Sequence, residues 1–103
     1  MEARRHAQVT ASIPGVRNGP GQLVLTNEGP AVARSVTVEI SSAYQAKPPA
    51  VFGLEQLPVD LRPGQPISFD LVASWGDATL INALVRWVGD AGPHEATYTL
   101  RTL

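Results

Sequence analysis

Apolar and polar residues alternate along this chain in short segments, and residues that favour turns separate one segment from the next. The clearest segment spans residues 35–40, where Val36, Val38 and Ile40 alternate with three polar residues. A period of two is typical of a β-strand that buries one of its faces. Because a shift of one residue would expose the whole apolar row, the pattern also predicts which side chains face the core.

Six further segments show the same period. Their apolar rows are Val9, Ala11 and Ile13; Leu23 and Leu25; Leu57, Val59 and Leu61; Ile67, Phe69, Leu71 and Ala73; Ile81, Ala83, Val85 and Trp87; and Ala96, Tyr98 and Leu100. Pro58 restricts its row to a sheet edge or a loop, because proline donates no ladder hydrogen bond. The rows together predict an all-β fold, an antiparallel sandwich of about seven strands.

The chain has the length of one domain, at 103 residues, and contains no cysteine. We expect residues 8–103 to form the sandwich and residues 1–7 to form an N-terminal tail. Only Glu2 to Gln8 favours a helical turn, and a segment this short does not hold a helix alone in water. The tail is therefore expected to be a helical turn or a linker.

Net charge and hydropathy limit the classes of partner that this chain is expected to bind. The formal net charge is −1 and the charged residues are scattered, so we expect no nucleic-acid partner, which would need a basic stripe. No apolar run approaches the roughly 20 residues that span a bilayer. We expect a soluble domain that meets a membrane only if a spanning segment lies outside these residues. The compartment stays open, with an extracytoplasmic domain of a longer or anchored protein among the options.

Three local patterns occur in order along the chain. Residues 23–31 (LVLTNEGPA) lead into ARSVTV at 33–38, Leu61-Arg62-Pro63-Gly64 precedes an alternating strand, and WVGDAG at 87–92 precedes the last strand. Residues 8–103 thereby resemble the bacterial immunoglobulin-like sandwiches related to the cell-adhesion-related domain (CARDB) and to fibronectin type III. The resemblance implies an immunoglobulin-like sandwich of the spacer, adhesion or docking type, and it transfers no functional residue.

Catalytic and metal-binding groups are sparse. The histidines are His6, in the expected tail, and His94, in a turn; neither lies near the closest serine and acid pair, Ser74 and Asp77. A triad needs a histidine between such groups. The turn residues Asn27, Glu28, Asp77 and Asp90 are expected to cap their own backbone rather than bind calcium. We therefore expect no enzyme, no cofactor and no metal ion.

One predicted strand carries apolar residues on both faces. Its outward row is Leu84, Arg86 and Val88, and pairing with the third and last strands would place Thr37, Glu39, Thr97, Thr99 and Arg101 beside it. A flat face of this composition suits docking to a protein partner or to a second copy of the chain. The alternative is an ordinary surface, because single exposed apolar residues are common.

A second candidate surface is the proline-stiffened loop from Tyr44 to Phe52, together with Trp75 at a loop mouth. The favoured alternative is that the loop crosses between the sheets and Phe52 fills the core. Trp87 and Tyr98 fit the inward rows better than a sugar-stacking platform. The sequence thus predicts a non-enzymatic interaction or spacer module, and the alternative function is a carbohydrate-binding module that uses Trp75 and Tyr44.

Overall fold

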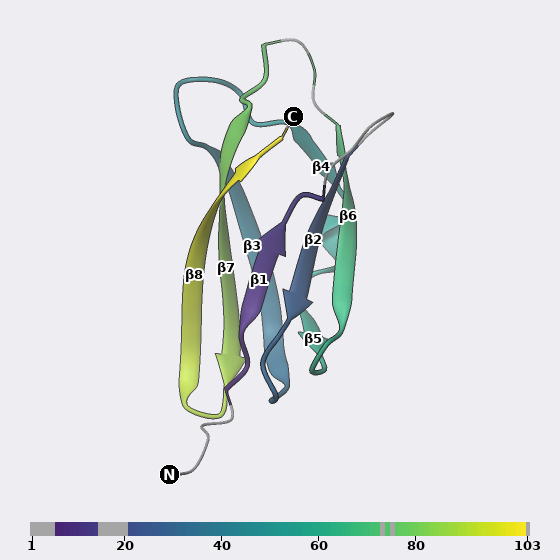
Figure 1. Cartoon of the computed structure of the whole chain (residues 1–103), viewed down its shortest axis with the longest axis vertical. Helices are drawn as coiled ribbons and strands as arrows, with labels where there is room; N and C mark the ends of the chain where they lie inside the picture. The colour runs from purple at the N-terminus through teal and green to yellow at the C-terminus, as the bar shows by residue number, and fades with distance from the viewer. Residues whose placement is uncertain (1–5, 15–20, 73, 75, 103) are drawn as a thin grey trace.

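The described residues form two four-stranded antiparallel sheets (Figure 1). The computed structural model describes residues 6–14, 21–72, 74 and 76–102. Its strands are β1 (Val9–Ser12), β2 (Gly21–Asn27), β3 (Ala33–Ser42), β4 (Ala50–Phe52), β5 (Val59–Leu61), β6 (Pro66–Val72), β7 (Leu80–Gly89) and β8 (Gly92–Arg101), with a 3-10 turn at Leu54–Gln56. One sheet has the order β1-β2-β6-β4 and the other β5-β3-β7-β8. The predicted all-β antiparallel sandwich is confirmed.

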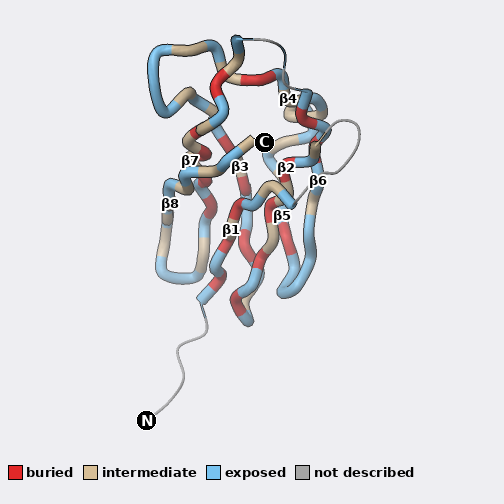
Figure 2. Tube along the Cα trace, turned by 45° about the horizontal axis from the view of Figure 1, so that its top comes forward, coloured by how far each residue is buried: buried red, intermediate tan, exposed pale blue. Residues whose placement is uncertain are grey.

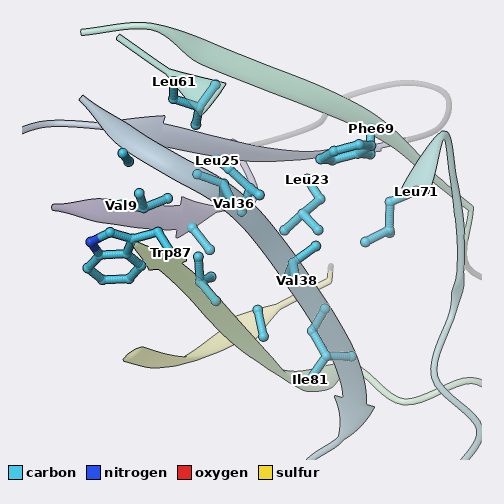
Figure 3. Packing of buried hydrophobic residues seen from close by; sticks show 14 of the residues in the cluster. Val9, Leu23, Leu25, Val36, Val38, Leu61, Phe69, Leu71, Ile81 and Trp87 are labelled. Atoms are coloured by element: carbon cyan, nitrogen blue, oxygen red, sulfur yellow. The ribbon is translucent and has the colours of Figure 1, made fainter. Parts of the chain in front are cut away.

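The alternating rows supply the core between the sheets (Figures 2 and 3). Trp87, Phe69, Leu25 and Val38 were expected inside from their phase, and all four are buried. The row of β7 is buried throughout, since this strand lies between β3 and β8. The phase of each central strand was therefore predicted correctly.

The inward row of β8 is only half-buried, because this strand lies at the edge of its sheet. Its Tyr98 reaches across to the other sheet, where the hydroxyl donates a hydrogen bond of 2.8 Å to the carbonyl of Val9. Gln8 donates to the same hydroxyl through Nε2 at 3.3 Å. Tyr98 is thus a structural contact between the two sheets, as its inward phase predicted.

The chain from β4 to β5 changes sheets. β4 pairs with β6 in one sheet, and β5 pairs with β3 in the other, so both are short edge strands. The edge position of β5 agrees with the restriction that Pro58 imposes. The loop before β4 crosses between the sheets as expected, but Phe52 is 57% exposed and does not fill the core. That expectation was wrong because the parity of β4 directs Val51 toward the core instead.

A buried polar residue organises one end of the sandwich. The side chain of Asn27 accepts hydrogen bonds from the backbone N–H groups of Gln8 and Gly29, and it donates to the carbonyls of Ala31 and Leu61. The bond to Gly29 is the expected capping of its own turn. The bond to Ala31 lies within the same turn, and those to Gln8 and Leu61 join the approach to β1 and the end of β5 to it.

The segment before β1 packs tightly on this end. Ala7, which the prediction placed in the tail, is buried, and residues 6–8 have no regular structure. A Cβ atom on Gly29 would clash with the carbonyl oxygen of His6. Glycine is therefore required at 29 by a close backbone approach. Residues 1–5, the rest of the expected tail, lie outside the described residues.

Candidate interaction surfaces

Three of the residues considered for catalysis, Ser74, Asp77 and His94, make structural contacts. Asp77 accepts the backbone N–H of Ser74 at 2.7 Å, so the carboxylate caps a turn. The ring of His94 stacks on the indole of Trp87, with centroids 5.8 Å apart and an interplanar angle of 20°. Within the described residues, no three His, Cys, Asp or Glu side chains gather as metal ligands would.

The predicted outward row lies on the outer face of the β5-β3-β7-β8 sheet, which we call the docking face. Its members are Leu84, Arg86 and Val88, their cross-strand neighbours Arg34, Thr37, Glu39, Pro93, Glu95 and Thr97, and further along Thr99 and Arg101, which lie opposite Asn82 and Leu80. The register sets Leu84 between Glu39 and Thr97, as the sequence predicted. The prediction was wrong in part: it missed Glu95, which lies opposite Arg86, and it counted Thr99 and Arg101 as neighbours of this row, although they pair with Asn82 and Leu80.

Arg86 is the electrostatic centre of the docking face. Its Nη1 lies 3.3 Å from Glu39 Oε2 on β3, and its Nε lies 3.2 Å from Glu95 Oε2 on β8. All three side chains are more than half exposed, so each ion pair contributes at most about 1 kcal/mol to stability. The pairs fix the guanidinium across three strands, which orients it without burying it.

The apolar part of the docking face is unevenly exposed. Val88 is 40% exposed, whereas Leu84 is half-buried between its neighbours. Further along, the Thr99 hydroxyl bonds to the side-chain oxygen of Asn82 at 2.9 Å. The face therefore has an apolar prominence at Val88 and a polar, hydrogen-bonded end at Thr99.

A pocket of about 490 Å³ opens beside Val88. Its lining residues are Ser35, Arg86, Trp87, Val88, Pro93, His94 and Glu95. The indole N–H of Trp87 is buried and has no acceptor among the described residues. Figure 3 shows the ring nitrogen at the end of the indole that points away from the rest of the cluster. The pocket is thus a concave, mainly apolar site at the edge of the docking face.

A backbone irregularity forms one wall of this pocket. The pairing of β3 with both neighbours shifts register on either side of Ser35, whose φ is 52°. A β-bulge at this point bends the strand and redirects its side chains. Asp60 on β5 accepts the Ser35 N–H at 3.0 Å and holds the bulge. Nothing in the alternation of Ser35, Val36 and their neighbours signals a bulge, so the sequence did not predict the pocket.

The second predicted surface is divided between the two sheets. Tyr44 is 47% exposed, and its hydroxyl oxygen accepts the Thr79 N–H at 2.7 Å, close to the start of β7. The Thr79 side chain, at 3.1 Å, and then its backbone N–H lower the pKa of Tyr44 from 10.0. Phe52 lies in the other sheet, on β4, opposite Asp70 of β6. Trp75 lies outside the described residues.

Comparisons with known proteins identify no relative. No family model matches the chain, and neither curated proteins nor solved structures give a match. In the described part of the chain, no helix has the length and apolarity needed to cross a membrane. The functional proposal below therefore rests on the fold and on these surfaces.

Proposed function

We propose that this domain is a non-enzymatic, immunoglobulin-like interaction module that binds a protein partner through the docking face. The order of the strands supports the immunoglobulin-like assignment. β1-β2-β6-β4 corresponds to strands A, B, E and D of such folds, and β3-β7-β8 to strands C, F and G. This order, with the turn sequences around Asn27 and Gly64, supports membership of the group related to CARDB and fibronectin type III.

The observation that carries the proposal is the pocket beside Val88, which exposed apolar and charged side chains of the docking face border. An apolar partner side chain that enters the pocket removes its own surface and that of Val88 from water. Protein interfaces concentrate their binding energy in such central pockets, with a ring of polar contacts around them. Arg86 and its two carboxylates supply that ring here.

The experiment uses two valines of equal exposure on opposite sheets. Val88 on the docking face and Val72 on the outer face of β6 are each 40% exposed. A photo-crosslinking residue is placed at each position in the native cells, and the crosslinked protein is identified and purified. We expect a specific product from position 88 and none from position 72.

Binding of that purified partner is then measured by calorimetry. The double variant Leu84→Asp, Val88→Lys should abolish binding and keep the fold, because both changes lie on the outward row. Val72→Lys is the matched control and should bind like the wild type. Equal crosslinking at 72 and 88, or full affinity of the double variant, would reject the docking face.

A carbohydrate-binding module is the second candidate, and the fixed, half-exposed ring of Tyr44 favours it. Two contacts to Thr79 hold the hydroxyl, so the ring presents a rigid flat surface of the kind that stacks on sugars. A glycan array and a tryptophan-fluorescence titration with polysaccharides separate the candidates. Binding that is lost in Tyr44→Ala and kept in the Leu84→Asp, Val88→Lys variant would favour the carbohydrate module.

A further inference from the structure

The four sheet edges of this molecule are very unequal. The edge strands β1, β4 and β5 contain 4, 3 and 3 residues, whereas β8 contains 10. Only β7 pairs with β8, and no other described segment covers its outer side (Figure 1). A long open edge is a template for another strand, and proteins usually shorten or block such edges. The uncharged run from Ala96 to Leu100 contains no proline or lysine that would block it.

The register identifies the residues that present free backbone groups. β7 and β8 pair without a shift from Gly89–Gly92 to Leu80–Arg101, and the next pair is joined by the Thr102 N–H donating to the carbonyl of Thr79. Backbone groups alternate between the two sides of a strand. The even-numbered residues of β8 therefore bond to β7, and the odd-numbered ones point their N–H and C=O groups outward. The outward residues with a donor are Glu95, Thr97, Thr99 and Arg101.

We propose that β8 pairs antiparallel with β8 of a second copy of the chain, about a two-fold axis at Tyr98. In this register Glu95 lies opposite Arg101 of the partner subunit, and Thr97 lies opposite Thr99 of the partner subunit. Each of these outward pairs forms two ladder hydrogen bonds. The two sheets then join into one continuous sheet across the dimer.

Charge complementarity selects this register over its neighbours. Only residues whose backbone groups point outward can pair across the dimer. The two-fold axis must therefore pass through a residue and not between two residues, and the alternative registers place it at a different residue. An axis at Thr97 places Glu95 opposite Thr99, and an axis at Ala96 places it opposite Thr97. Only the axis at Tyr98 sets each Glu95 against an Arg101, and opposite charges or two threonines are favourable cross-strand pairs. The isologous arrangement uses the same edge twice.

This dimer does not depend on the proposed docking function. It uses the backbone edge of β8, whereas docking uses the pocket and the side chains around Val88. The Leu84→Asp, Val88→Lys variant should therefore keep the wild-type dimerisation constant while it loses partner binding. A dimer that this variant abolishes would have formed through the docking face, and the edge proposal would be wrong.

A charge exchange between two variants tests the register directly, with sedimentation equilibrium of the full chain as the readout. Glu95→Lys and Arg101→Glu each set like charges against one another in their own homodimer. Each should weaken dimerisation by about tenfold, since two cross-strand pairs change from attraction to repulsion. An equimolar mixture of the two variants should regain wild-type affinity, because every Glu then faces a basic residue. Loss of the Arg86–Glu95 contact cannot then explain the weaker dimer of Glu95→Lys, because the contact is still absent in the mixture while the affinity returns.

A proline substitution tests the edge hydrogen bonds. Thr97→Pro removes an outward N–H that β7 does not use, so the variant should fold and fail to dimerise. Thr97→Ser, the matched control, keeps the N–H and should dimerise like the wild type. A wild-type chain that stays monomeric at millimolar concentration, or a mixture no tighter than the separate charge variants, would overturn the proposal.

Discussion

The two ends of the sandwich are closed by different chemistry. At the Asn27 end, which holds the 27–31 turn and the β7–β8 hairpin, a fully buried amide makes four hydrogen bonds at 2.7–3.2 Å. At the Tyr44 end, which holds the loops before β4 and β7, the side-chain bonds of Tyr44 and Asp77 are exposed. Both ends join segments distant in sequence, but among the described residues only the first does so through a fully buried polar side chain.

The difference indicates where the free energy of unfolding is concentrated. A hydrogen bond on the surface replaces one to water and contributes little, whereas a buried polar group that loses its partners retains its full desolvation penalty. The Asn27 end therefore penalises any rearrangement of three chain segments at once, the approach to β1, the 27–31 turn and the end of β5. The Tyr44 end holds its loops by contacts that water can replace, so substitutions there should be tolerated.

The largest expected contrast comes from one aromatic residue at each end. Trp87 is 4% exposed beside the β7–β8 hairpin, and Phe52 is 57% exposed on β4. Trp87→Ala should reduce the free energy of unfolding by about 3–5 kcal/mol, the usual cost of a large buried aromatic side chain. Phe52→Ala should reduce it by less than about 1 kcal/mol. Urea denaturation measures both, and equal losses would refute the division into a rigid and a tolerant end.

The second-largest expected effect comes from removing the side-chain hydrogen bonds of Asn27. Asn27→Ala leaves the N–H of Gly29 and the carbonyl of Leu61 without their partners at buried positions, so we expect a loss of about 2–4 kcal/mol. Asp77→Ala at the other end removes one exposed bond to Ser74 and should cost less than about 1 kcal/mol. A small loss at Asn27, comparable to that at Asp77, would mean that water replaces the buried bonds.

The alternation of apolar residues predicted the core because parity is a local property. The inner face of a strand, such as the one that carries Ile81 to Trp87, can be identified from the period of that strand alone. Features that depend on a partner strand were not predictable in this way. Asn27 was expected to cap its own turn, but its bond to Leu61, 34 residues away, follows from the position of β5.

The same distinction between local pattern and strand pairing applies to the candidate surfaces. The neighbours of Leu84 on β3 and β8 followed from strand parity and pairing order, and the structure has them in that register. The pocket beside Val88 depends on a bulge at Ser35, which requires the pairing of two strands with β3 at once. Phe52 was misplaced because β4 is too short for its period to be read, and the adjacent prolines obscured it.

The smallest effect is a pH dependence at the Tyr44 end. The Thr79 side chain, followed by its backbone N–H, stabilises the phenolate and lowers the pKa of Tyr44 from 10.0. Because the pKa is lower in the folded state, ionisation of Tyr44 favours folding. The contribution is absent below the folded pKa, grows as pH rises through it, and is complete above the unfolded pKa. It should be small, since the hydroxyl is exposed.

Removal of the Thr79 hydroxyl, the larger cause of the lowered pKa of Tyr44, tests this assignment. In Thr79→Val the N–H remains but the hydroxyl is lost, so the pKa of Tyr44 should return part of the way toward 10.0 while the fold is kept. Phenolate absorbance is titrated in the wild type and in Tyr44→Phe, and the difference between the curves isolates Tyr44 from Tyr98. The two titrations are repeated with Thr79→Val added to the wild type and to Tyr44→Phe, and the difference between the curves is taken again. An unchanged curve would show that solvent, and not Thr79, determines the ionisation of Tyr44, and the exposed contacts of this end would then have no measurable role.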